Sequence, residues 1–180
     1  MKKVLSIISV ITESIEKFII CASIVLMMVN STANAIGRYF FNQSLFFSEE
    51  LNQFLIVAIT FIGFAYAVRK GRNIRMTALY DALNQSARKV IYTLIAFSTS
   101  ALMFFLAYLS YGYVQELQAL NRLSPALQFP VYIVYSIIPI GLTMAGIQYL
   151  ISFIMNLTHR EIYVSYDVIE EQAAPQGDPL

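Results

Sequence analysis

The chain has 180 residues, of which 58% are hydrophobic and only 13% are charged. Soluble domains contain about 25% charged residues, so this composition indicates an integral membrane protein. The net charge of +1 argues against a nucleic-acid partner. The single cysteine, Cys21, excludes an internal disulfide and a cysteine-rich metal site, and the single histidine, His159, excludes paired-histidine haem ligation.

Four long runs with very few charged residues predict four transmembrane helices, at about 18–39, 48–68, 88–115 and 131–157. A helix rises about 1.5 Å per residue, so about 20 residues cross a hydrocarbon core of about 30 Å. The sequence therefore predicts an all-α integral membrane protein with a four-helix transmembrane domain over residues 18–158, together with short amphipathic surface helices.

Residues 1–17 precede the first span, and their polar and apolar positions recur in steps of three or four. This period predicts an amphipathic N-terminal helix, which either lies on the membrane surface or continues the first span into water. A basic start and an apolar run that ends in Ala33-Asn34-Ala35 also resemble a secretory signal. Three charged residues between those two features, and a late cleavage point, argue against cleavage.

The second span has charges of opposite sign at its two ends. Glu49 and Glu50 precede the uncharged run Leu51–Val68, and four basic residues follow that run: Arg69, Lys70, Arg72 and Arg75. The dipole at the start of a helix favours negative charge, which gives the two carboxylates a capping role. Alternatively, one of them pairs with Arg38 or with a partner protein.

Small residues and a proline predict where helices meet or bend. Gly63 with Ala67, and Gly141 with Ala145, have the i,i+4 spacing that lets two membrane helices approach closely. Pro139 should bend the fourth span, because proline lacks an N–H and clashes with the preceding turn. The first span carries polar side chains that either belong against another helix or mark its polar end: Asn30, Ser31, Thr32 and Asn34.

The loop 69–89 contains six Lys/Arg and one acid, and its apolar residues predict a short surface helix: Ile74, Ala78, Leu79, Ala82 and Leu83. We expect the polar tail 159–180 to be disordered. Segments 1–17, 69–89 and 159–180 together hold ten Lys/Arg, whereas the two remaining loops hold only Arg38 and Arg122. The positive-inside rule therefore predicts that both termini are cytoplasmic.

The sequence has no nucleophile–histidine–acid set, no phosphate-binding loop and no histidine or cysteine pair at metal-ligand spacing. No acid or base lies in the middle of a span. We therefore expect no enzyme activity, no cofactor and no bound metal. A subunit that packs against a larger protein fits this pattern. The alternative is a stand-alone oligomeric transporter or channel, with a path lined by polar residues such as Asn30, Asn34 and Gln148.

Several short segments resemble the small membrane subunit of tripartite ATP-independent periplasmic (TRAP) transporters. They are Arg38-Tyr39-Phe40-Phe41-Asn42, Ser48-Glu49-Glu50-Leu51, Gly63 with Ala67, Arg69-Lys70-Gly71-Arg72-Asn73-Ile74, Pro125-Ala126-Leu127 to Pro130, and Ile138-Pro139-Ile140-Gly141. Together they cover about a third of the chain. The whole chain is most similar to small subunits of sialic-acid systems.

The resemblance implies a multi-pass protein of the bacterial inner membrane that binds a large, many-span transport subunit. That subunit would carry the substrate and sodium sites and move as an elevator, while a periplasmic binding protein would deliver an organic acid. The small subunit would be a fixed scaffold that also contacts membrane lipids. Arg38, Glu49 and Glu50 would shape its outer end. Arg69, Arg72 and Arg75 would hold its inner end at the headgroups.

Overall fold

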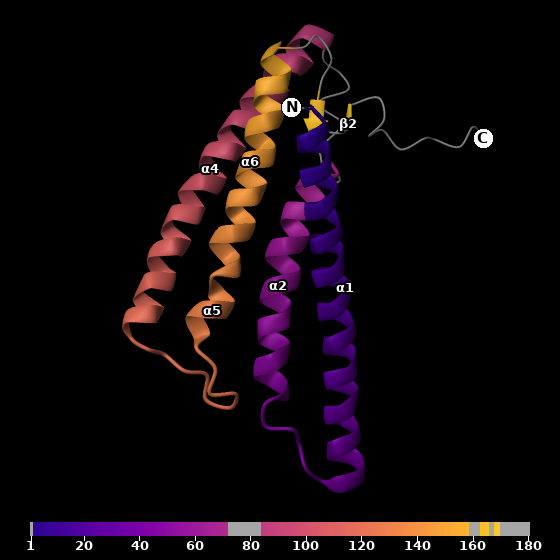
Figure 1. Cartoon of the computed structure of the whole chain (residues 1–180), viewed down its shortest axis with the longest axis vertical. Helices are drawn as coiled ribbons and strands as arrows, with labels where there is room; N and C mark the ends of the chain where they lie inside the picture. Colours follow the sequence, from indigo (N-terminus) through magenta and orange to yellow (C-terminus); the bar gives the residue numbers. More distant parts are fainter. Residues whose placement is uncertain (1, 72–83, 159–162, 166–167, 170–180) are drawn as a thin grey trace, which may run out of the picture. The chain divides into compact units, whose positions relative to one another are not determined.

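The structure is a computed structural model that describes residues 2–71, 84–158, 163–165 and 168–169. Its elements are the helices α1 (Lys2–Phe41), α2 (Ser48–Arg69), α4 (Gln85–Ala119), α5 (Val131–Tyr135) and α6 (Ile137–Thr158), and the strands β1 (Tyr163–Ser165) and β2 (Val168–Ile169) (Figure 1). In this described part, four segments are long and apolar enough to cross a membrane: Ile11–Phe41, Ser48–Arg69, Ala87–Ala119 and Val131–Thr158. The predicted four-span helical architecture is confirmed.

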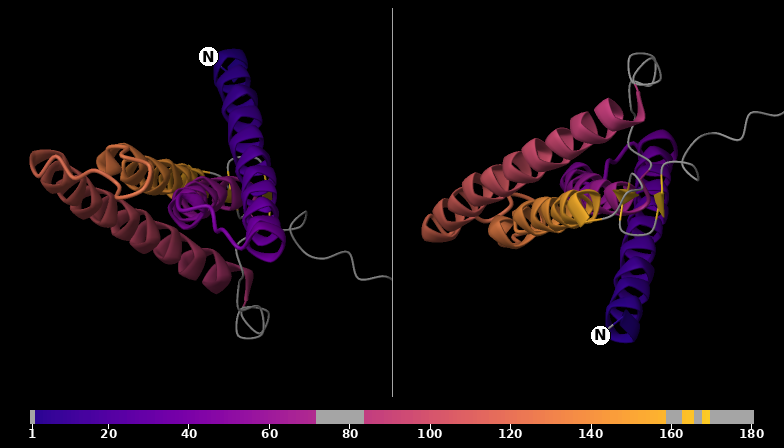
Figure 2. Two further views of the ribbon diagram at one scale, coloured as in Figure 1. Left: turned by 90° about the horizontal axis from the view of Figure 1, so that it is seen from below. Right: turned by 90° about the horizontal axis from the view of Figure 1, so that it is seen from above.

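The N-terminal segment and the first span form one uninterrupted helix (Figures 1 and 2). Lys17 forms an ion pair with Glu13 at 2.6 Å, and its Nζ lies 5.9 Å from the centre of the Tyr66 ring on α2. Glu16 is buried. Residues 2–17 therefore belong to the same helix as the first span.

The described chain forms two compact units. The first comprises residues 1–66 and 107–141, and the second comprises residues 67–106 and 142–180. The first unit contains α1, most of α2, the end of α4, the loops 42–47 and 120–130, α5 and the start of α6. Every residue of the candidate site described below belongs to this unit.

Within the first unit, α1 and α2 form a hairpin that is joined by side-chain amides. The buried Asn30 donates through Nδ2 to the carbonyl oxygen of Ser48 at 2.9 Å and to Oδ1 of Asn52 at 2.8 Å. Asn52 in turn donates to Oγ of Ser31 at 3.0 Å. Asn30 and Ser31 thus bond to α2, which is one of the two predicted alternatives, and Ser31 and Thr32 are both exposed.

The loop 42–47 is closed by backbone and side-chain hydrogen bonds. Asn42 has φ 50, a left-handed conformation that commonly follows a helix end, and the N–H of Gln43 donates to the carbonyl of Gly37 at 3.1 Å. A Cβ on Gly37 would lie 2.8 Å from the carbonyl oxygen of Gln43, so this close return of the chain requires glycine. Asn34 accepts the N–H of Leu45 at 2.8 Å.

Helix α4 continues past the predicted end of the third span at residue 115 and ends at Ala119. The end of the helix has Schellman geometry. Asn121 has φ 44, and its N–H donates to the carbonyl of Gln118 at 3.0 Å. The N–H of Arg122 donates to the carbonyl of Leu117 at 3.4 Å. Glu116 is exposed and Leu117 is buried. The extra turn is stable because it buries this leucine and leaves the carboxylate outside.

The fourth span is interrupted, as Pro139 predicts, but one turn earlier than the proline itself. Helix α5 ends at Tyr135 and α6 begins at Ile137, with Ser136 between them. Proline removes the N–H that would bond to the carbonyl four residues before it, and its ring clashes with that group. That carbonyl belongs to Tyr135, which places the break there.

In the second unit, α4 and α6 approach closely at small residues. Ser100 donates through Oγ to the carbonyl of Gly146 at 3.0 Å, and the rings of Phe97 and Phe153 lie 5.3 Å apart. After α6, β1 pairs antiparallel with β2. This short pairing, which aligns Tyr163 with Ile169, was not predicted for the tail. The predicted surface helix at residues 74–83 lies outside the described residues.

Candidate functional site

The loop 120–130, between α4 and α5, is held by a carboxylate of α2. Glu50 accepts the hydroxyl of Ser124 and the backbone N–H groups of Ala126, at 3.0 Å and 3.1 Å from its two oxygens, and of Leu127 at 3.1 Å. We call Glu50 with these three loop residues the loop clamp. It joins the first turn of the second span to the connection between the third and fourth spans.

The loop folds back on itself before it meets Glu50. The N–H of Ser124 donates to the carbonyl of Phe129 at 2.9 Å, and the N–H of Gln128 donates to the carbonyl of Ser124 at 3.0 Å. Leu123 and Pro130 form an isolated antiparallel bridge at its base. The N–H groups of the two residues after Pro125 point to Glu50, so the carboxylate supplies the acceptors that this tight turn lacks.

Hydrogen bonds to an ionised carboxylate are shorter and stronger than hydrogen bonds between neutral groups. Ser124 is 2% exposed, so its buried hydroxyl would be left without an acceptor if the carboxylate were absent. Glu50 also lies in the first turn of α2, where the helix dipole favours its charge. It therefore combines the predicted capping position with a second role in holding the loop.

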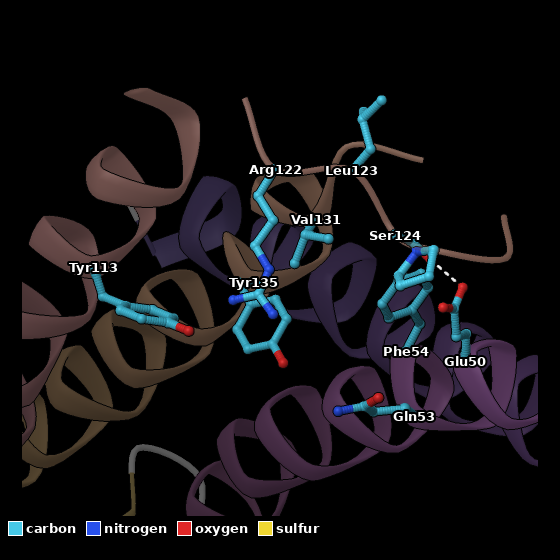
Figure 3. A pocket seen from close by; sticks show the side chains of 10 residues that line it. Glu50, Gln53, Phe54, Tyr113, Arg122, Leu123, Ser124, Val131 and Tyr135 are labelled. Carbon is cyan, nitrogen blue, oxygen red and sulfur yellow. Dashed lines mark hydrogen bonds between the residues drawn. The ribbon is translucent and has the colours of Figure 1, made fainter. Parts of the chain in front are cut away.

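A small pocket of about 120 Å³ lies beside the loop clamp (Figure 3). Its lining includes Glu50 and Gln53 from α2, Arg122 and Ser124 from the loop, Tyr113 from α4 and Tyr135 from α5. The rings of Tyr113 and Tyr135 meet edge to face at 5.9 Å. Figure 3 shows Arg122 extending from the loop toward Tyr135, away from the carboxylate of Glu50.

The polar groups around the pocket can bind and position a ligand. In the described part of the chain, no group of three or more His, Cys, Asp or Glu is placed to hold a metal ion. The pocket is lined by the guanidinium of Arg122, the hydroxyls of Tyr113 and Tyr135, and the carboxamide of Gln53. These groups recognise other polar or charged groups.

The structure separates the three charged residues predicted for this end. Arg38 and Glu49 are both exposed, and within the described residues neither forms an ion pair. The alternative in which Arg38 pairs with one of the carboxylates is therefore absent here. Glu50 alone is engaged, and its partners are in the loop.

The predicted close-packing residues differ in how tightly they pack. A Cβ on Gly141 would lie 2.6 Å from the carbonyl oxygen of Phe61, so α6 touches the backbone of α2 there. A Cβ on Gly63 would meet only the side chain of Ile20, at 4.0 Å, so that approach is ordinary. Ala145 is fully buried, whereas Pro139 and Ala67 are partly exposed.

Of the predicted basic residues at the end of α2, Arg69 is 5% exposed. Helix α2 ends at Arg69, and in the turn that follows Gly71 has φ 61 and donates its N–H to the carbonyl of Val68 at 3.0 Å. Arg72 and Arg75 lie outside the described residues.

Sequence reasoning missed two residues of this end, Asn52 and Ser124. Asn52 could have been found, because it is an asparagine inside an apolar run. The same pattern makes a contact with another helix one of the two interpretations of Asn30 and Asn34. For Ser124 the signal was weaker. The segment Ser124-Pro125-Ala126-Leu127 predicts a tight turn with unsatisfied N–H groups, but it does not identify their acceptor.

Comparisons with known proteins agree with this architecture. Residues 24–159 match the family described as tripartite ATP-independent periplasmic transporters, DctQ component. The chain is also similar to the ectoine TRAP transporter small permease protein TeaB of Halomonas elongata. The two sequences are 44% identical over 167 residues, which cover 93% of this chain and 86% of the relative.

Proposed function

Because the chain belongs to the DctQ family, the small membrane component of tripartite ATP-independent periplasmic transporters, we propose that it is the non-catalytic scaffold of such a transporter. In this role it binds a large elevator-type transport subunit in the bacterial inner membrane. The large subunit carries the substrate and sodium sites. A periplasmic binding protein delivers the substrate to the outer face.

The observation that carries the proposal is the use of polar groups within the chain itself. Asn30 and Asn52 bond to each other and to neighbouring backbone and hydroxyl groups, and Asn34 holds the loop 42–47. Polar side chains of a channel would instead face a water-filled path. Of the three residues that would line a path in a stand-alone transporter, Asn30 is therefore engaged in joining two helices and Asn34 in holding a loop.

The third such residue, Gln148, has a buried Oε1 without a hydrogen bond in the described part of the chain. Because this atom is buried within the chain itself, it does not face an open path of the kind that a stand-alone transporter would need.

For the substrate, the relative's name provides a first candidate. It refers to ectoine, a small zwitterion with one carboxylate, and not to a sialic acid. We therefore take ectoine, or a solute of similar size and charge, as the organic acid to test before sialic acid. Recognition of that solute belongs to the other two components.

We further propose that the loops 42–47 and 120–130 face the periplasm and that both termini are cytoplasmic. The distribution of Lys and Arg supports this orientation, because the cytoplasmic segments hold ten, whereas the only two others are Arg122 in the loop 120–130 and Arg38 at the end of α1. Arg69, Arg72 and Arg75 then lie at the inner leaflet, where anionic lipid headgroups attract basic residues.

Co-purification tests the scaffold proposal directly. The tagged chain is expressed with the neighbouring genes and extracted in a mild detergent. A stable one-to-one complex with a much larger many-span protein supports the proposal, particularly if neither protein alone transports ectoine. A homo-oligomer of this chain that transports solute without a larger partner contradicts it and supports the stand-alone alternative.

A further inference from the structure

The pocket beside the loop clamp contains four polar side chains that the chain does not use for its own folding. They are the guanidinium of Arg122, the hydroxyls of Tyr113 and Tyr135, and the carboxamide of Gln53. Within the described residues, none of the four makes a hydrogen bond or an ion pair. Gln53, Tyr113 and Arg122 are exposed and Tyr135 is half-buried, so the polar groups of this cluster are accessible to a partner.

The charges of the pocket are divided between its two sides. On one side, both oxygens of Glu50 accept hydrogen bonds from the loop. On the other side, the guanidinium of Arg122 keeps its N–H donors available, and Figure 3 shows it directed toward Tyr135. A planar guanidinium matches a carboxylate through two parallel hydrogen bonds, and tyrosine hydroxyls and an amide can complete the contacts.

Two further observations indicate the occupant. A volume of about 120 Å³ accommodates one side chain, but not a protein segment. Arg122 is also the single Lys/Arg in the two loops assigned to the periplasmic side, 42–47 and 120–130, where basic residues are not needed for orientation. A cation at this exposed position, without a partner in the described chain, is suited to an acidic partner that arrives from the periplasm.

We propose that the pocket formed by Arg122, Tyr113, Tyr135 and Gln53 receives a carboxylate side chain of the periplasmic binding protein. This inference rests on the proposed function, because it requires the tripartite assembly. The loop clamp fixes the backbone that carries Arg122, so the guanidinium is presented without a further ordering cost on docking. Arg122 is thus a docking residue, and Glu50 positions it.

The test uses the complete membrane complex in nanodiscs and measures its affinity for the purified periplasmic binding protein. Arg122→Gln should weaken binding at least about tenfold, because it removes one partner of a desolvated charge pair. Arg122→Lys should fall between Arg122→Gln and the wild type, because the charge remains but the planar fork is lost. Raising the salt concentration should weaken the wild type more than Arg122→Gln.

Gln43→Glu is the matched control. Gln43 is exposed in the other loop of this end, and its substitution changes the net charge by the same single unit as Arg122→Gln. It should leave the affinity unchanged. Equal affinities of Arg122→Gln and the wild type, or equal weakening by both substitutions, would overturn the inference.

A second measurement separates a protein carboxylate from a free one. Ectoine and acetate are titrated into the membrane complex without the periplasmic protein. Arg122-dependent binding of either solute would overturn the inference and assign the pocket to a solute. If the scaffold proposal is wrong, the large subunit will be absent from the purified complex. This result is obtained before any Arg122 variant is measured, so it is distinguished from a failure of the present inference.

Discussion

The carboxylate of Glu50 accepts the backbone N–H of Ala126 at 3.0 Å, so the first turn of α2 holds a loop that follows it by 76 positions. The adjacent Glu49 has the same chemistry, but it is exposed, and its carboxylate makes no hydrogen bond or ion pair within the described residues. This difference between two neighbouring carboxylates offers an internal control for the role of the loop clamp.

Glu50→Gln should lower the stability of the subunit more than Glu49→Gln does, because the amide is neutral and has only one acceptor oxygen for the three donors of the loop. Glu49→Gln should change it by less than about 0.5 kcal/mol, as expected for an exposed surface residue. Thermal unfolding in detergent, followed by size-exclusion chromatography, measures both. Equal effects of the two substitutions would contradict the clamp. In the assembled transporter, neither substitution should alter the ion stoichiometry of transport.

Gly141→Ala should destabilise the subunit by about 1–3 kcal/mol through overpacking. The new Cβ would meet backbone atoms of Phe61 at 2.6 Å and 2.9 Å, and backbone cannot move aside as a flexible side chain can. Gly112→Ala on α4 is the control, because a Cβ there meets nothing within 4 Å. It should be neutral or stabilising by up to about 1 kcal/mol through helix propensity. Unfolding in mixed SDS micelles gives the comparison, and a neutral Gly141→Ala would refute the close contact.

The amide network of the α1–α2 hairpin should show coupling between Asn30 and Asn52. Interhelical hydrogen bonds in membranes contribute about 0.6 kcal/mol on average and up to about 1.7 kcal/mol. A double-mutant cycle with Asn30→Leu and Asn52→Leu should therefore give a coupling energy of about 1 kcal/mol. Thr32→Val, at an exposed position of the same helix, should show no coupling to Asn52→Leu. Additive effects of the two asparagine substitutions would mean that the bond contributes no stability.

The proposed orientation predicts a labelling pattern in intact cells. After Cys21→Ser removes the single native thiol, cysteines placed at Gln43 or Gln128 should react with a membrane-impermeant maleimide from outside. A cysteine at the exposed Thr158 should react only after permeabilisation. The reverse pattern would place the termini in the periplasm and contradict the orientation inferred from the positive charges.

The spans could be predicted because the absence of charge over about 20 residues is a local property of the sequence. The exact helix ends depend on finer features. Helix α4 extends to Ala119 because Leu117 finds a buried position, and the fourth span breaks at Ser136 because a proline acts on the carbonyl four residues earlier. The first of these depends on packing that the sequence does not display.

The loop clamp could not be predicted from the sequence, for a different reason. The sequence identifies Glu49 and Glu50 as a pair in the first turn of a helix, where either satisfies the dipole. Which carboxylate faces the loop depends on the rotation of α2 about its axis, and the three donors come from a turn more than 70 positions away. Similarly, small pairs were found at both Gly63 and Gly141, but only Gly141 touches the backbone of a neighbouring helix.

The separation in sequence between Glu50 and its partners also has a consequence for biosynthesis. Domains made on the ribosome form from the N-terminus, and the amide network between α1 and α2 joins residues only 18 and 22 positions apart, so this hairpin can close early. The hydrogen bond between Glu50 and Ser124 can form only after a loop 74 positions later has been translated. The clamp closes only if that loop emerges on the same side of the bilayer as the 42–47 loop. A chain whose third span is threaded in the wrong direction leaves the carboxylate without its partners, so the clamp distinguishes correct from incorrect insertion.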